Sequence, residues 1–166
     1  MSDDPDIEFE LVLDQHFESR VVGGDANPLV DARIRVDSKY VLGSETTYAG
    51  DYMTGHLIDE LNALLGVHRG EAQTVEFSDG PLFLVLLPAG DDRVTLVGCY
   101  DVKETTPTDT IAEATVSISS WAQTIIETTE LYYERMLALN PDLKNNDDLN
   151  LLSSELESTV SALEFV

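Results

Sequence analysis

The histidines are the side chains of this sequence best suited to acid–base or metal chemistry near neutral pH. There are three of them, His16, His56 and His68. His56 precedes Asp59 and Glu60 by three and four residues, so all three would lie on one side of a helix. This spacing offers an imidazole beside carboxylates. With 32 Asp and Glu in the chain, such a neighbour is expected by chance. We therefore interpret His56 as a partly exposed histidine beside solvated acids.

Thiol and phosphate chemistry find little support in the sequence. Cys99 is the sole cysteine, so an internal disulfide is excluded. A lone cysteine in a predicted strand is usually an inert, small apolar side chain. The sequence contains no CxxC pair, nucleophile elbow, Walker loop or GxGxxG pattern. We predict no catalytic, metal-binding or cofactor-binding residues, and the sequence favours a protein that is not an enzyme.

Basic residues gather in one part of this acidic chain, between Arg20 and Lys39. Arg33 and Arg35 share one face of a predicted strand. They either pair with nearby carboxylates of the same chain, which we favour, or grip an acidic partner through the planar guanidinium fork. The candidate partner-binding residues join these cations to a tyrosine and three leucines of the C-terminal helices: Arg33, Arg35, Lys39, Tyr133, Leu149, Leu152 and Leu156.

Alternation of apolar and polar residues predicts an N-terminal sheet after an acidic, disordered tail over residues 1–6. The expected strands cover 7–13, 16–22, 30–36 and 40–48, and the second of them is the weakest. From Asp51 the apolar period changes to three and four residues, which predicts an amphipathic helix that ends at Gly66 or Gly70. Further strands are expected over 73–77, 82–87, 93–102 and 112–119, with a polar loop over 105–110.

The run Leu82–Leu87 holds six consecutive large hydrophobic residues between two prolines. A short apolar run with turn signals at both ends predicts a strand buried on both faces, at the centre of a sheet. Two helices are available to cover those faces. One is the helix that begins near Asp51, and the other begins at Ser119 or Ser120 and contains Trp121.

The last third of the chain is predicted to be helical. One helix ends near Leu139, because Pro141 cannot continue its hydrogen bonding. A second, over 147–164, carries a narrow leucine seam that suits one partner helix, in the same chain or in another. We predict an α+β fold: a single domain with an antiparallel or mixed sheet of about six or seven strands, one inserted helix and a C-terminal helical pair. Residues 7–139 form its body, and residues 140–166 pack on that body or on a partner.

The charge of the chain limits its environment and its partners. The formal net charge is −23, with 9 Lys and Arg against 32 Asp and Glu. The acidic residues are spread along the whole chain, in a pattern that resembles cytosolic proteins of extremely halophilic archaea. Imitation of nucleic acid, or binding of a basic partner, is the alternative. No basic stripe, long apolar segment or signal peptide is present, so we expect a cytoplasmic protein that binds neither nucleic acid nor membrane.

The order of the expected elements over 7–139 resembles that of small immunity proteins encoded beside toxin or defence genes. The likeness is one of architecture, with the leucine pattern Leu57, Leu61, Leu64 in the first helix and Ser120-Trp121 at the start of a closing helix. It implies a non-enzymatic, immunity-like or regulatory module that binds a protein partner, which we take as the leading expectation. A small-ligand-binding or enzymatic domain, with a sheet-lined pocket around Arg33, Arg35 or His56, is one alternative. A homo-oligomer joined through the last helix is another.

The acidity generates a first prediction, on salt. Lowering KCl from molar to tens of millimolar lengthens the Debye length from about 3 Å to more than 10 Å, so that surface carboxylates repel one another. We expect the fold to loosen and its melting temperature, followed by circular dichroism, to fall. Equal thermal stability at both salt concentrations would contradict adaptation to high salt.

Overall fold

The alternating segment Leu29–Val36 forms strand β2, which holds together the first of two sheets in the computed structural model of residues 4–163. Strand β1 (Ile7–Leu11) pairs with one side of β2. Strands β3 (Lys39–Leu42) and β4 (Ala49–Tyr52) pair with the other side, and all three pairings are antiparallel. The strand expected over 40–48 is thus two short strands. Gly43, at a φ of +78°, follows β3 in a backbone conformation that favours glycine.

The second sheet contains four antiparallel strands in chain order, namely β5 (Gln73–Phe77), β6 (Leu82–Pro88), β7 (Arg93–Lys103) and β8 (Thr106–Ser117). The apolar run is confirmed as an inner strand of this sheet. The loop expected over 105–110 is wrong, because β8 already begins at Thr106 and Pro107 pairs with Val102. Proline is tolerated there because β8 is an edge strand, which can leave a backbone donor position unused.

Helix α1 (Gln15–Val22) stands where a weak strand was expected. The Asp14 side chain accepts a hydrogen bond from the Phe17 backbone N–H at 3.1 Å and so caps the helix. Phe17 and Val21, one helical turn apart, are both buried. The strand prediction for 16–22 is therefore wrong, because a good cap and one apolar turn outweigh a poor alternation.

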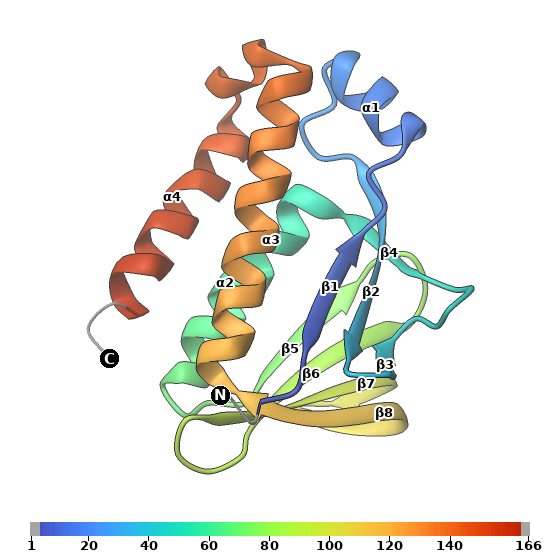
Figure 1. The fold of residues 1–166 in the computed structure, drawn as a ribbon, viewed down its shortest axis with the longest axis vertical. Coiled ribbons are helices and arrows are strands. Elements are labelled where there is room, and N and C mark those ends of the chain that lie inside the picture. The colour runs from blue at the N-terminus through green and yellow to red at the C-terminus, as the bar shows by residue number, and fades with distance from the viewer. Residues whose placement is uncertain (1–3, 164–166) are drawn as a thin grey trace.

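Helix α2 (Met53–His68) is the inserted helix, and it is buried on most of its circumference. Figure 1 shows it behind α3 (Ile118–Leu139), with β5 and β6 below it and α4 (Asp147–Leu163) beside it. A short 3-10 helix, Pro141–Asn145, joins α3 to α4. Leu149 and Leu152 of α4 are fully buried in the main core. The leucine seam thus packs within its own chain.

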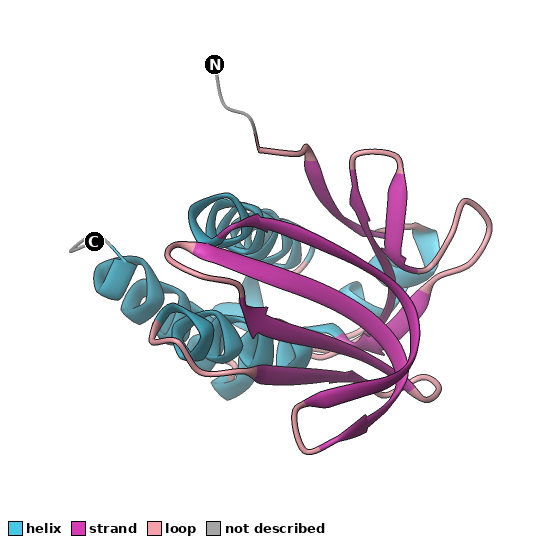
Figure 2. Ribbon diagram, turned by 90° about the horizontal axis from the view of Figure 1, so that it is seen from below, coloured by secondary structure: helices cyan, strands magenta, loops and turns pink. Residues whose placement is uncertain are grey.

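The second sheet is covered by helices on one face. Leu84 and Leu86 of β6 belong to the main core, whereas Val85 belongs to a small separate cluster with Val97 and Cys99. Figure 2 shows this other face, with the helices behind the strands. The expectation that helices cover β6 on both faces is therefore wrong. Side chains of neighbouring strands bury Val85 instead.

The α+β class, the antiparallel pairing, the inserted helix and the C-terminal helices are confirmed, and the strands divide into two sheets of four. Residues 1–3 and 164–166 lie outside the described residues. In the described part of the predicted tail, the Ser120 hydroxyl donates to Asp4 at 3.1 Å, and the Asp6 backbone N–H donates to Asp37 at 2.9 Å. Within residues 4–163, no helix has the length and apolar character needed to cross a membrane.

The two sheets meet where β3 crosses β7. A Cβ atom built on Gly98 would lie 1.8 Å from the backbone oxygen of Val41, so that only glycine permits this approach. Beside the crossing, the Lys39 Nζ donates to the backbone oxygen of Glu113 at 3.0 Å. An isolated bridge between Gly50 and the turn after β5 makes a second contact between the sheets.

Substitution of Gly98 is expected to separate the sheets. Gly98→Ala places a methyl group against backbone that cannot move without breaking a strand, and we expect a loss of at least about 3 kcal/mol in the free energy of unfolding. Denaturant unfolding in molar KCl measures it. Gly55→Ala in α2 is the matched control, since its Cβ meets nothing closer than 3.8 Å. The control should gain about 0.5–1 kcal/mol. Equal stability of the two variants would show that the crossing does not constrain the fold.

Candidate functional site

A buried histidine lies between two carboxylates at the junction of β4 and α2. The Nδ1 atom of His56 is 2.7 Å from Oδ2 of Asp51, and its Nε2 atom is 2.9 Å from Oε2 of Glu60. Glu60 follows His56 by one turn of α2, as the spacing predicted. Asp51 comes from β4, and Asp59 points to the exposed side of the helix. The interpretation of His56 as partly exposed is wrong, since its side chain is fully buried.

Both carboxylates favour the charged imidazole. Burial alone would lower the pKa of His56, but the hydrogen bonds and negative charges of Asp51 and Glu60 outweigh it and raise this pKa to about 9. Burial likewise acts to raise the pKa of Asp51. Hydrogen bonds from His56 and Ser78 overcome that effect, so the pKa lies below its ordinary value of 3.8. The group is thus an imidazolium held between carboxylates at neutral pH.

Aromatic rings enclose the imidazolium on its remaining sides. The ring of Phe77 is 4.2 Å from the His56 ring between centroids, and that of Phe9 is 6.2 Å away. Glu60 Oε1 is buried and has no hydrogen-bond partner among the described residues. Both nitrogens of His56 are engaged, and neither pocket described in the structure reaches it. We assign this cluster a structural role.

The predicted partner-binding arginines are already paired within the chain. β1 and β2 place Glu8 opposite Arg35 and Glu10 opposite Arg33, and both pairs form salt bridges. Arg33 also donates to the backbone oxygens of the loop after β3 and lies 4.7 Å from the ring centroid of Tyr48. The interpretation as internal ion pairs therefore accounts for both arginines. Neither pocket includes Arg33, Arg35 or His56, so the structure does not bring these residues together.

The other predicted residues are dispersed over the fold. Lys39 is exposed on β3, and its amine links that strand to β8. Tyr133 and Leu156 are half-buried and pack against the main core. Leu149 and Leu152 are fully buried beneath α4. The structure does not gather these side chains into one surface.

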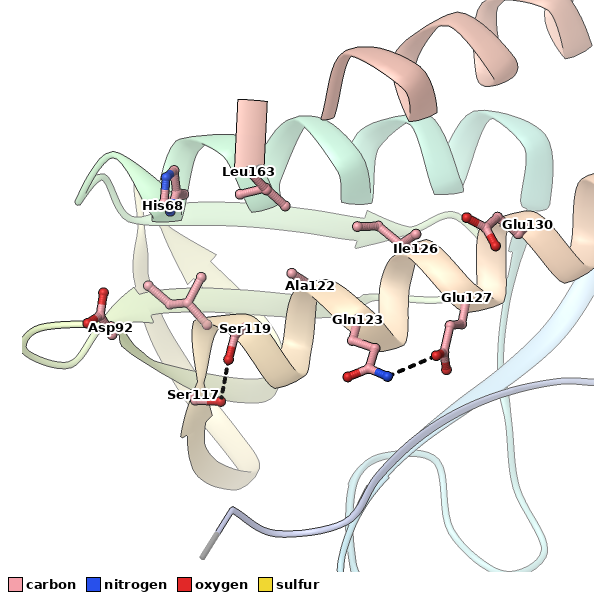
Figure 3. A pocket seen from close by; sticks show the side chains of 11 residues that line it. His68, Asp92, Ser117, Ser119, Ala122, Gln123, Ile126, Glu127, Glu130 and Leu163 are labelled. Atoms are coloured by element: carbon pink, nitrogen blue, oxygen red, sulfur yellow. Dashed lines mark hydrogen bonds between the residues drawn. The ribbon is translucent and has the colours of Figure 1, made fainter. Parts of the chain in front are cut away.

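A groove of about 740 Å³ opens beside the N-terminal half of α3, and no sequence pattern singled it out (Figure 3). The end of α2, the turn between β6 and β7, the first turns of α3 and the last described residue of α4 form its walls. The lining residues are His68, Asp92, Ser117, Ile118, Ser119, Ala122, Gln123, Ile126, Glu127, Glu130 and Leu163.

Two rows of side chains run along α3 in this groove. Ile118, Ala122 and Ile126 follow one another at steps of four residues and form an apolar row. The polar row beside it contains Gln123 and Glu127, which are joined by a hydrogen bond of 3.0 Å. Ile118 was expected in a strand over 112–119, but α3 begins at this residue, so the row was missed. Its regular step of four was the available signal.

The groove is acidic, and its carboxylates lack basic partners. Asp92, Glu127 and Glu130 are exposed on its lining, and none of them takes part in an ion pair among the described residues. Of the lining residues that the structure describes, none is Lys or Arg. An apolar row beside unpaired carboxylates suits a ligand with an apolar face and a positive charge.

Comparison with protein-family models, curated proteins and solved structures finds no match to this chain.

The buried imidazolium generates a prediction on pH. The folded-state pKa of His56, about 9, lies above its ordinary 6.5, so its stabilising effect is complete below pH 6.5 and is lost as the pH rises through 9. The loss in unfolding free energy should be about 3 kcal/mol, since each pKa unit corresponds to about 1.4 kcal/mol. The lowered pKa of Asp51 acts oppositely, because its stabilisation is lost as the pH falls below 3.8. Denaturant unfolding at a series of pH values in molar KCl measures both the loss of stability at high pH and the loss at low pH.

Two variants isolate the effect. His56→Gln leaves two buried carboxylates without a cation and should cost about 3–5 kcal/mol at pH 7. It should also flatten the stability profile between pH 6.5 and 9. Glu60→Gln retains the Asp51–His56 pair and an acceptor for Nε2, so its cost should be smaller. A His56→Gln protein that keeps the wild-type slope above pH 6.5 would show that another group titrates there.

Proposed function

We propose that the chain is a non-enzymatic protein-binding module, of an immunity-like or regulatory kind, that works in the cytoplasm of a halophilic cell. The observation that carries this proposal is the groove along α3, where an apolar row and unpaired carboxylates lie side by side. Ile118 and Ile126 are half-buried and Ala122 between them is buried, so the row lies at the base of the groove, and apolar side chains line the base of most binding sites. The fully buried His56 cluster, by contrast, offers a substrate no access.

Three features support a protein ligand over a small molecule. The apolar row is extended, since the step from Ile118 to Ile126 covers about 12 Å along the helix axis. Most polar side chains of the groove, among them Asp92, Gln123 and Glu127, are exposed, whereas a small-molecule site usually has a few buried, convergent polar groups. The floor of the groove is a regular helix, the kind of surface on which a partner helix packs.

Site-directed cross-linking in the cell tests the proposal. A photoreactive residue in place of Gln123, which is exposed on the polar row, should give one discrete adduct with a protein partner at native salt. The same residue in place of Glu76, exposed on β5 away from the groove, should not. Adding Ile126→Glu to the Gln123 variant should abolish the adduct, because a charge in the apolar row opposes burial.

Circular dichroism will check that the Ile126→Glu protein is folded, which we expect because Ile126 is only half-buried. No adduct at position 123, equal adducts at 123 and 76, or an adduct that survives Ile126→Glu would each count against binding through the groove.

A further inference from the structure

We infer that the groove takes an amphipathic helix of a partner protein, with an apolar face and with Lys or Arg along its flank. This inference rests on the proposed function and adds the chemistry of the partner.

Helix α4 shows what kind of segment the surface of α2 and α3 accepts. α4 packs on both helices, and Leu149, Leu152 and Thr159 are buried along it at helical spacing. Its last described residue, Leu163, forms one wall of the groove. Beyond it, α3 continues toward Ile118 and keeps its apolar row. A second helix that follows the direction of α4 would therefore meet a surface of the type that α4 already covers.

The length of the row sets the size of the occupant. The apolar row extends for about 12 Å, which is a little over two turns of a helix. A helix of about three turns, with apolar side chains at i, i+3 or i+4, and i+7, covers such a row with its anchors. The small side chain of Ala122, which is buried, stands at the middle of the row between two isoleucines, so an anchor of the partner would seat between those isoleucines.

The charges select a basic flank. All six arginines of the chain form ion pairs with carboxylates of the same chain. Glu127 and Glu130 lie beside the apolar row, and Asp92 lies at its N-terminal end (Figure 3). A cationic helix gains contacts with these carboxylates, whereas an acidic helix places like charges directly against them.

The test measures binding of synthetic helical peptides to the full chain by fluorescence anisotropy, in molar KCl and at about 0.5 M KCl. The basic peptide has leucine anchors at the spacing above and lysines on its flank. An acidic peptide replaces each lysine by glutamate, and a scrambled peptide keeps the composition of the basic one. We expect the basic peptide to bind at least about tenfold more tightly than either, a difference of about 1.4 kcal/mol. The preference over the acidic peptide should grow at the lower salt concentration.

Charge-reversed variants assign the preference to the groove. Glu127→Lys with Glu130→Lys should reverse it, so that the acidic peptide binds more tightly, and both residues are exposed, so the fold should tolerate the change. Glu76→Lys with Glu113→Lys makes the same change of charge on the second sheet and should leave the preference unaltered.

Three results would overturn the inference. Equal binding of the basic and acidic peptides would show that the groove does not select a partner helix with a basic flank. Failure of the basic peptide to bind the full chain, with binding gained on deletion of residues 164–166, would assign the groove to the end of the chain itself. If the wild-type chain self-associates and Ile126→Glu abolishes this self-association, the groove would be assigned to a second copy of the chain. A cross-link at position 123 with no preference among the peptides refutes this inference alone, whereas the absence of both refutes the proposed function too.

Discussion

One imidazolium, sealed between two carboxylates, holds the centre of this molecule together. His56 belongs to α2, Asp51 to the first sheet, and Phe77, whose ring lies against the imidazole, to the second. Three buried charges are tolerated only while their geometry is kept, because separation leaves a desolvated charge without compensation. The orientation of α2 toward both sheets is therefore fixed at this point. Since α3 and α4 pack on α2, the position of the groove depends on it as well.

The sequence reveals those parts of the fold that rest on local periodicity. The strand 30–36, the apolar strand at the centre of the second sheet and the three long helices each carry their own signal, and the structure contains all of them. The segment 16–22 was misread because its helix signals, the Asp14 cap and the pair Phe17 and Val21, are short. The burial of His56 was missed for another reason. Glu60 lies within one helical turn of His56, but Phe9 and Phe77 come from distant strands. No local sequence pattern predicts the contacts of these two rings with His56.

The distribution of charge connects the salt environment to the groove. The arginines form ion pairs within the chain that link strands and loops, such as Arg33 with Glu10. The surplus of carboxylates remains at the surface, where molar salt screens charge over about 3 Å. Under such screening, charges interact only when they touch, so acidity by itself attracts no distant partner. An acidic surface becomes selective where an apolar row brings a partner close enough for direct ion pairs, and the α3 groove has both features.

Contacts at the start of α3 join the floor of the groove to the N-terminal segment and the second sheet. The Ser117 hydroxyl accepts a hydrogen bond from the Ser120 backbone N–H at 3.0 Å and caps the helix. Asp4 accepts a hydrogen bond from the Ser120 hydroxyl and lies 3.7 Å from Arg93 of β7, which ties the N-terminal segment, α3 and the second sheet together. On the proposed function, a partner that docks beside Ile118 would meet a helix already held by these contacts, and the free-energy cost of ordering that helix would not fall on binding. Such a preformed helix would suit a short partner segment that folds as it binds.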